Sequence, residues 1–575
     1  MKARPFLAAL LAAALALLSF GFAAWWLLLE RGPLGLQSHS LQLPLAARFV
    51  PRTAPLSLHW LVSPDQAAAY ARAMAPPRQR REAAAAVERL RDGAFAAAGL
   101  DYASELASWL GGESSLALLS SPDQAGRPGW VLALRSRDSA GARRFLQRFW
   151  QTRSLAGTDL QISSYRGMGL ISGRGALLGQ DPQPLATALI NDDLVLIASG
   201  RGALEQALDV SQIDELNQAA SAPLQQAVAR LEHGVALLTA RPEAMQAWLG
   251  LPLATASADG ASQPLVELVA ALQPSGTALD VDALAQLRAP LPRRSLGSGD
   301  QLLHALQQPA RSLALLSSPA DLLADLQAAP EPALSAADQG EPVAAMVDQE
   351  ETASDTQPDT QPSSQAADPW RTLLGPLLHQ VIGQASGPLP ALVAAADQGP
   401  LLWADLPEGW LLGTSEANPP LEVLQQQLAQ QGFSVSPLQS RGQTLQVWTR
   451  LRSRPVKGNP DQLQAELAGA RSTEGPWAWW GQGLAVLHQQ HEAHQPPQAR
   501  LEQLEALATP QAPLQWAMDA STARELLAGW TPWRLLTTLS STPLTPVVDG
   551  AALSLEGDAD QPRALHLRAR LELRG

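Results

Sequence analysis

Three histidines recur at a spacing of three residues late in the chain: His488, His491 and His494. On a helix this spacing spreads the rings over about a third of the circumference, so they could share one metal ion. The His pair four residues apart that a metalloprotease helix needs is missing. The break at Pro496-Pro497 equally fits a polar loop after a strand. The cluster is therefore a weak metal-site candidate, and a solvated loop is the alternative.

The aromatic run Trp477-Ala478-Trp479-Trp480 is the second unusual group. In a strand, Trp477 and Trp479 point to one face and Trp480 to the other. One face is expected to lie in the core. The other is a candidate contact surface for a sugar, a lipid or a protein.

The remaining composition excludes several kinds of enzyme. The chain has no Cys, so thiol catalysis and Cys-ligated metal sites are excluded. Its two lysines, Lys2 and Lys457, fit neither a phosphate-binding loop nor a Ser-Lys nucleophile pair. Asp192 and Asp193 lie in a predicted hairpin turn, where Asp is a common turn former. We predict no catalytic residue and no cofactor.

The N-terminal sequence predicts a membrane anchor. Lys2 and Arg4 precede residues 5–29, which carry no charge. As a helix this run would be about 37 Å long, enough to cross a hydrocarbon core of about 30 Å. Basic residues before the run predict a cytoplasmic N-terminus and an exported remainder. A cleaved signal peptide ending near Gly21-Phe22-Ala23 is the alternative, although its apolar core is usually shorter.

Length and charge set further bounds. The chain has 575 residues, of which 46% are hydrophobic, so it can form two to four domains with real cores. Its net charge of −13 argues against nucleic acid as a partner. Residues 331–368 contain nine acidic and no basic residues, a composition typical of disorder. This segment is either a tolerated insertion or an acidic tether for a basic partner.

The rest of the chain repeats one succession of predicted elements. In each half, a strand ending in Ser-Pro leads into a helix, and later two strands flank an Arg-Gly turn. The octet Ser-Leu-Ala-Leu-Leu-Ser-Ser-Pro occurs at residues 115–122 and again at 312–319. A hairpin turning at residues 191–193 is matched by strands predicted at 477–480 and 484–487.

These patterns predict an α+β fold with mainly antiparallel sheets, covered by helices on one face. Residues 565–573 alternate between apolar and polar side chains, as expected of a strand with one wet face. The predicted division is an anchor over residues 1–32, a first module over 33–300, and a second over 301–575. Residues 331–368 interrupt the second module.

Several short motifs carry a resemblance to a known family. They are Phe49-Val50-Pro51, Trp109-Leu110-Gly111-Gly112-Glu113, Tyr165-Arg166-Gly167 and the stretch 188–196. Together with the predicted anchor, they resemble the bacterial, mainly cyanobacterial, family called domain of unknown function 3352. The resemblance covers residues 45–300 well and the second half more loosely. It implies a membrane-anchored exported protein in the periplasm or thylakoid lumen, and it implies no catalytic residue.

Three functional hypotheses follow. The first is a non-enzymatic binding or scaffold protein, attached to the membrane through residues 5–29, with a protein partner on the exported face. The second is a carrier or sensor for a lipid or another apolar ligand, because curved sheets can enclose an apolar pocket. The third is an unrecognised hydrolase that uses carboxylates or the histidine cluster.

Overall fold

The computed structural model describes residues 32–122, 128–154, 160–175, 182–250, 264–323, 370, 382, 387–456, 459–558 and 560–574. The predicted anchor and the acidic segment 331–368 lie outside these residues. Within the described part of the chain, no helix combines the length and the apolar character needed to span a bilayer.

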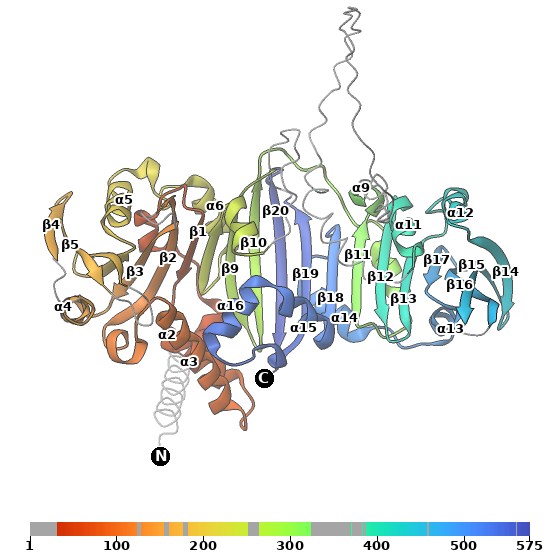
Figure 1. The fold of residues 1–575 in the computed structure, drawn as a ribbon, viewed down its shortest axis with the longest axis horizontal. Helices are drawn as coiled ribbons and strands as arrows, with labels where there is room; N and C mark the ends of the chain where they lie inside the picture. The colour runs from red at the N-terminus through yellow and green to blue at the C-terminus, as the bar shows by residue number, and fades with distance from the viewer. Residues whose placement is uncertain are drawn as a thin grey trace, which may run out of the picture.

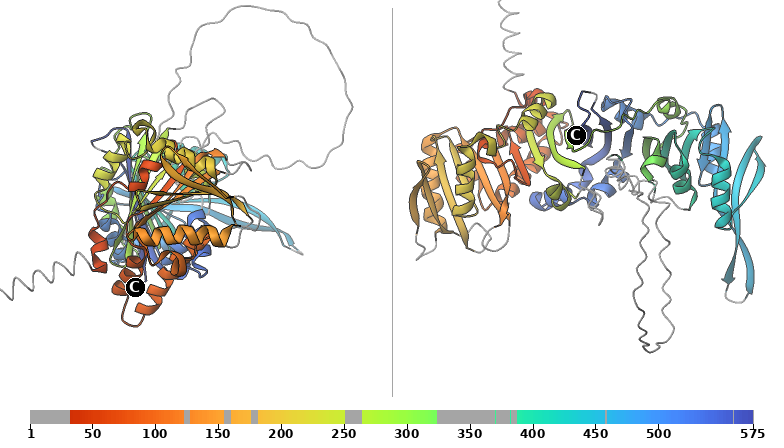
Figure 2. Two further views of the ribbon diagram at one scale, coloured as in Figure 1. Left: turned by 90° about the vertical axis from the view of Figure 1, so that its left-hand side faces the viewer. Right: turned by 90° about the horizontal axis from the view of Figure 1, so that it is seen from above.

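Among the described residues, the dominant feature is one antiparallel sheet of twenty strands, which confirms the predicted α+β class (Figure 1). Viewed along its long axis, the sheet twists so that the outer strands fan across the central ones (Figure 2). From one edge to the middle, the strands are β4 (Gln161–Tyr165), β5 (Met168–Gly175), β6 (Gln183–Ile190), β7 (Leu194–Ala198), β3 (Pro128–Ser136), β2 (Leu110–Pro122), β1 (Leu56–Trp60), β8 (Ala236–Ala240), β9 (Leu265–Ser275) and β10 (Ala278–Leu287).

The sheet continues without a break into the second half of the chain. β10 pairs with the C-terminal strand β20, in a register that runs from Ala278 opposite Glu572 to Gln286 opposite Ala564. From the middle to the other edge, the strands are β20 (Ala564–Leu573), β19 (Val548–Gly557), β18 (Leu514–Asp519), β11 (Ser312–Ser317), β12 (Pro400–Leu406), β13 (Gly409–Ser415), β17 (Trp477–Gly481), β16 (Asn459–Glu474), β15 (Gln443–Val456) and β14 (Ser434–Ser440).

The strand order is the same when it is read inward from either edge. The series 4-5-6-7-3-2-1-8-9-10 corresponds position by position to 14-15-16-17-13-12-11-18-19-20. β1 therefore corresponds to β11, and the two strands run in opposite directions. The boundaries of the two predicted modules stay a prediction.

The strand matching based on the sequence pairs the strand before Ser63-Pro64 with the strand before Ser318-Pro319, and the equivalence of β1 and β11 confirms it. Two further details differ. The recurring octet lies on β2 in the first half and runs along β11 into the next helix in the second. Because β11 corresponds to β1, the two octets are not equivalent. The strand predicted at residues 484–487 is the first turn of a helix that follows β17 directly. The hairpin at residues 191–193 is confirmed, with φ of 47° at Asn191 and 64° at Asp192.

Helices cover both faces of the sheet, so the prediction of helices on one face is wrong. We name the faces after two successive residues of β1, whose side chains point to opposite sides: the Leu58 face and the His59 face. The helices that pack on the Leu58 face are α4 (Ser139–Arg153), α7 (Pro242–Ala247), α11 (Leu389–Ala396), α12 (Leu421–Gln430), α15 (Ala520–Gly529) and α16 (Thr531–Ser540).

A second layer packs on the His59 face. It consists of the short helix η2 (Leu45–Phe49) with α5 (Arg201–Ser211), α6 (Ala222–Leu231), α8 (Gly299–His304), α13 (Leu484–Glu492) and α14 (Gln498–Ala506). Four further elements border the sheet and are used below: η1 (Pro33–Ser38), α2 (Pro64–Met74), α3 (Arg80–Ala97) and η3 (Tyr102–Leu106). The helix α9 (Pro319–Leu323) follows β11.

Candidate functional site: an uncovered apolar stretch of the sheet

The Leu58 face is left open over β1 and β2, in the interior of the sheet. Leu58 is 45% exposed and Leu116, directly opposite it on β2, is 40% exposed. Interior strands of a layered protein normally bury such side chains. We call this surface the apolar window. Five leucine side chains, paired in register across β2, β1 and β8, form the apolar surface of this window. They are Leu56, Leu58, Leu116, Leu118 and Leu238.

One end of the apolar window is polar. Trp60 and Ser114 oppose each other in the same register, one pair beyond Leu58 and Leu116. The Trp60 Nε1 and the Ser114 Oγ are shielded from solvent, and neither has a hydrogen-bond partner within the described residues. The indole N–H can only donate, whereas the hydroxyl can donate or accept. Such unpaired groups cost about 1–3 kcal/mol each, so this end favours an oxygen acceptor.

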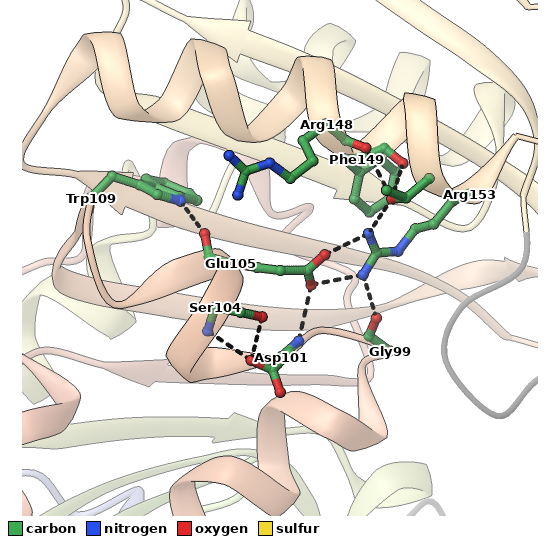
Figure 3. A network of polar contacts seen from close by, with 9 residues as sticks. Gly99, Asp101, Ser104, Glu105, Trp109, Arg148, Phe149 and Arg153 are labelled. Carbon is green, nitrogen blue, oxygen red and sulfur yellow. Dashed lines mark hydrogen bonds and ion pairs between the residues drawn. The ribbon is translucent and has the colours of Figure 1, made fainter.

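On one side, the window ends where the layer of α4 begins. Leu132 on β3 is opposite Leu116 and lies in the core beneath α4. The C-terminal end of α4 is fixed by Arg153, whose two Nη atoms donate to the Glu105 carboxylate of η3 over 2.8 and 2.7 Å. Arg153 also donates to the Gly99 carbonyl oxygen (Figure 3). This bidentate, nearly buried ion pair holds η3 against α4.

On the other side, two helices from different halves of the chain meet. α2 packs beside the polar end, where Tyr70 and Met74 join Trp60 in a small apolar cluster. α3 then crosses α16 so closely that a Cβ on Gly93 would lie 1.8 Å from the Leu539 carbonyl oxygen. Only glycine allows that approach. The border of the window is therefore built from both halves of the molecule.

The opposite face of the same strands is closed and polar. His59 Nδ1 lies 2.8 Å from Ser115 Oγ, and its Nε2 lies 3.1 Å from Ser57 Oγ. Thr239 and Gln218 complete the network. Complete burial lowers the pKa of His59 to about 4, against an opposing effect of Gln218, so the ring is neutral at pH 7. No substrate can reach these hydroxyls, and the network holds β1, β2 and β8 together.

The structure separates the three predicted metal ligands. His488 is buried on α13, with a shielded Nε2 that has no partner within the described residues. His491 is exposed, 3.6 Å from Glu474, and His494 lies beyond the helix end with its Nδ1 next to its own loop backbone. Among the described residues, no group of three or more His, Cys, Asp or Glu side chains is placed to hold a metal ion.

The predicted tryptophan surface is wrong for two of its three residues. Trp479 and Trp480 are 1% and 0% exposed, because α13 and α12 cover the two faces of β17. Trp480 Nε1 donates to Thr414, and its ring stacks on Trp448. Trp477 is half-buried at the start of the strand. The run is a core element of the second half.

The family motif at residues 109–113 is also structural. Trp109 packs in the core under α4, and its Nε1 donates to the Glu105 carbonyl oxygen. Glu113 is buried and accepts a hydrogen bond of 2.8 Å from the Ala46 amide in the first turn of η2. A carboxylate at a helix start is favourable because free amides point toward it. Neither residue reaches the apolar window by a polar contact.

Sequence reasoning did not find the apolar window. The residues of β1, Leu-Ser-Leu-His-Trp, alternate between apolar and polar, which indicates two different faces. It does not say which face is covered, and here the polar face is the buried one. Nothing in the sequence indicates that Trp60 Nε1 would lack a hydrogen-bond partner among the described residues.

Comparison with known proteins identifies a family and no activity. No curated protein matches the chain. Among solved structures, crystal form III of TP0453 aligns at a TM-score of 0.26 with 9% identity, covering 47% of this chain and 88% of that one. Crystal form I of TP0453 aligns at 0.25 with 10% identity, covering 44% and 81%. The family model described as protein of unknown function (DUF3352) matches residues 10–571, so the chain belongs to that family.

Proposed function

We propose that this protein is a non-enzymatic binding protein for an amphipathic, lipid-like molecule, and that the apolar window is its binding site. The observation that carries the proposal is the exposure of Leu58 and Leu116 in the interior of the sheet, next to the unpaired Trp60 Nε1 and Ser114 Oγ. Ligand sites are mostly apolar with a few placed polar groups, and this surface has that composition. An acyl chain would cover the leucines, and its oxygen-bearing head would accept from Trp60.

We also propose that the chain is membrane-anchored through residues 5–29 and exported, in the inner or thylakoid membrane. The first described element, η1, begins four residues after that run and packs against α2. α2 borders the polar end of the apolar window through Trp60. This arrangement supports a window that lies near the bilayer, so that a lipid could reach it directly.

The proposal is tested by native mass spectrometry of the full chain, released from its membrane in a mild detergent. The test variant carries Leu58→Asp and Leu116→Asp, which place two charges on the apolar wall. The matched control carries Leu451→Asp and Leu463→Asp, two exposed leucines on β15 and β16. We expect the wild type and the control to retain lipid at near-stoichiometric level and the test variant to lose it.

Two further readouts sharpen this experiment. Each methylene group that the window buries contributes about 0.8 kcal/mol, so retained chains should share a minimum length. Trp60→Phe should keep the apolar contact but weaken the preference for ligands with an acceptor head. Equal lipid retention by the wild type and by the variant with two aspartates would exclude the window as the binding site.

A second candidate function, a protein contact, is favoured by a different surface. β14 is exposed along almost its whole length, and Leu451 and Leu463 beside it are 70% and 67% exposed. Ser453, two residues after Leu451, pairs with Leu463, so the two leucines lie diagonally on one face. If this edge binds a partner, the wild type should co-purify with one stoichiometric protein that the Leu451→Asp, Leu463→Asp variant loses. Retention of the same partner by that variant would argue against this surface.

A further inference from the structure

We infer that the tip of the α2–α3 hairpin docks on the anionic headgroups of the membrane to which the chain is attached. Four arginines lie at or next to this tip: Arg72, Arg78, Arg80 and Arg81. No acidic residue occurs between Asp65 and Glu82. All four side chains are exposed, as are Pro76 and Pro77 at the turn itself. The stretch between Asp65 and Glu82 thus carries four positive charges and no negative one, in a chain of net charge −13.

These four guanidinium groups make few contacts with the described part of the protein. No carboxylate of the described residues forms an ion pair with any of them, whereas Arg91, further along α3, pairs with Asp65 at 2.7 Å and with Asp92 at 2.9 Å. Arg80 makes a weak contact of 3.4 Å from its Nε to the Ala75 carbonyl oxygen. Exposed arginines that form no ion pair are suited to phosphate groups.

The path of the chain places this tip close to the bilayer. Gln37 Nε2 donates to Tyr70 Oη over 2.9 Å and lies 3.9 Å from the sulfur of Met74, the last residue of α2. Gln37 lies only eight positions after residue 29, where the uncharged run ends. Eight residues span at most about 28 Å. The inference therefore rests on the proposed anchor, but not on the proposed ligand.

The corresponding position in the second half has the opposite charge. α2 and α3 lie between β1 and β2, and the acidic segment 331–368 lies between the corresponding β11 and β12. Because β1 and β11 run in opposite directions, the two connections leave the sheet at opposite ends, as α2 and α9 do in Figure 1. An anionic surface attracts the end of the sheet that carries the α2–α3 tip and repels acidic residues of the chain. The charge distribution thus selects one orientation of the molecule.

The inference is tested with the full chain in lipid nanodiscs of phosphatidylcholine, with or without phosphatidylglycerol. The chain has no Cys, so Gln79→Cys at the tip and Gln439→Cys on β14 each give one labelling site. A nitroxide at each site reports its distance from the headgroups through relaxation by a lipid-attached metal chelate. We expect the residue 79 label to approach the headgroups only with phosphatidylglycerol, and the residue 439 label to stay remote.

Charge reversal provides the matched comparison. Arg78→Glu, Arg80→Glu and Arg81→Glu reverse charge at the tip, and Arg143→Glu, Arg144→Glu and Arg148→Glu reverse charge at exposed positions of α4. The α4 variant also loses the ion pairs of Arg143 with Asp192 and of Arg144 with Asp138. Each arginine near an anionic surface strengthens the docking equilibrium roughly fivefold, so the tip variant should lower the docking equilibrium constant about a hundredfold or more. The α4 variant should leave it unchanged, and added salt should weaken docking in the wild type.

The possible failures are distinguishable. A residue 79 label that stays equally far from the headgroups with and without phosphatidylglycerol overturns the inference. The same loss of docking in the α4 variant overturns it as well, because the effect would then follow net charge. Failure of the proposed ligand function leaves docking intact, since Leu58→Asp, Leu116→Asp should dock as the wild type does. If the chain does not stay in the nanodisc, that result contradicts the proposed anchor and also the docking inference that rests on it.

Discussion

Strands β1 and β11 occupy the same place in the two halves of the sheet, yet their side chains meet opposite surroundings. Each is the seventh strand counted inward from its own edge. On β11, Leu313 and Leu315 are buried on one face and Leu316 on the other, each at 0% exposure. On β1, the buried face carries Ser57 and His59, and the apolar face carries the exposed Leu58.

The difference lies in the elements that pack on each strand rather than in the strand itself. In the second half, α11 and Trp370 pack on the Leu58 face and complete a large core with Leu316. In the first half, the element before β2 is η3, which joins the core of α4 instead. A change in one connecting segment has therefore left an apolar surface open. The strand order around it is unchanged.

The largest predicted effect concerns the contact that holds η3 against α4. Glu105→Ala removes the carboxylate that pairs with the nearly buried Arg153. An uncompensated buried charge typically costs about 3–5 kcal/mol, and we expect that loss in the free energy of unfolding. Urea denaturation measures it. The control is Glu205→Ala, which breaks the more exposed pair with Arg201 and should cost about 0.5 kcal/mol or less. Equal costs would contradict the structural role of Arg153.

The second prediction compares the corresponding strands directly. Leu316→Ala should lower the free energy of unfolding by roughly 2–5 kcal/mol, because it leaves a cavity in a closed core. Leu58→Ala should cost about 1 kcal/mol or less, because that side chain is already 45% exposed. The same denaturation experiment measures both variants. Similar losses would mean that the apolar window is covered in solution.

The third prediction uses the buried histidine of the first half. Its folded-state pKa of about 4 lies below the unfolded value of 6.5, so the unfolded chain binds the proton more tightly. His59 therefore lowers stability as pH falls through about 6.5 toward 4, by about 3 kcal/mol in total. Unfolding followed across this range should show that slope in the wild type but not in His59→Gln. A slope that survives the substitution belongs to another group.

The fourth and smallest prediction has the opposite sign and concerns the second half. Burial raises the pKa of Asp397 to about 6, against the opposing hydrogen bond from the Gly399 amide. The folded chain then binds this proton more tightly, so Asp397 lowers stability as pH rises from about 4 toward 6. Asp397→Asn should stabilise the protein at neutral pH and steepen the acid loss due to His59. A variant less stable than the wild type at pH 7 would refute this sign.

Much of the fold was predictable from the sequence because it depends on local patterns. The alternation of residues 565–573 and the turn at residues 191–193 specify a strand and a hairpin on their own. The succession of elements indicated a repeated order. The octet carried little weight, because short runs of Leu, Ala and Ser recur by chance in a chain of this composition. Residues 484–487 fit a buried strand or a buried helix equally, and tertiary packing decided for the helix.

The candidate site was not predictable, for a physical reason. Exposure of Leu58 depends on where η3 and α4 settle, and that is fixed by Arg153 and Glu105, which are 48 residues apart. Burial of Trp479 and Trp480 depends likewise on helices that lie elsewhere in the chain. A sequence pattern describes one strand at a time and does not show which helices will pack on it.

The pairing of β10 with β20 has a consequence for how the protein is made. The first ten strands are synthesised before β20, yet β10 has no outer neighbour until that strand arrives. An unpaired strand edge invites aggregation, so the nascent first half needs protection while the second is produced. The ion pair between Asp280 and Arg570 then forms across the junction as one of the last contacts. Loss of β20 would leave two open edges, on β10 and on β19, in the middle of the molecule.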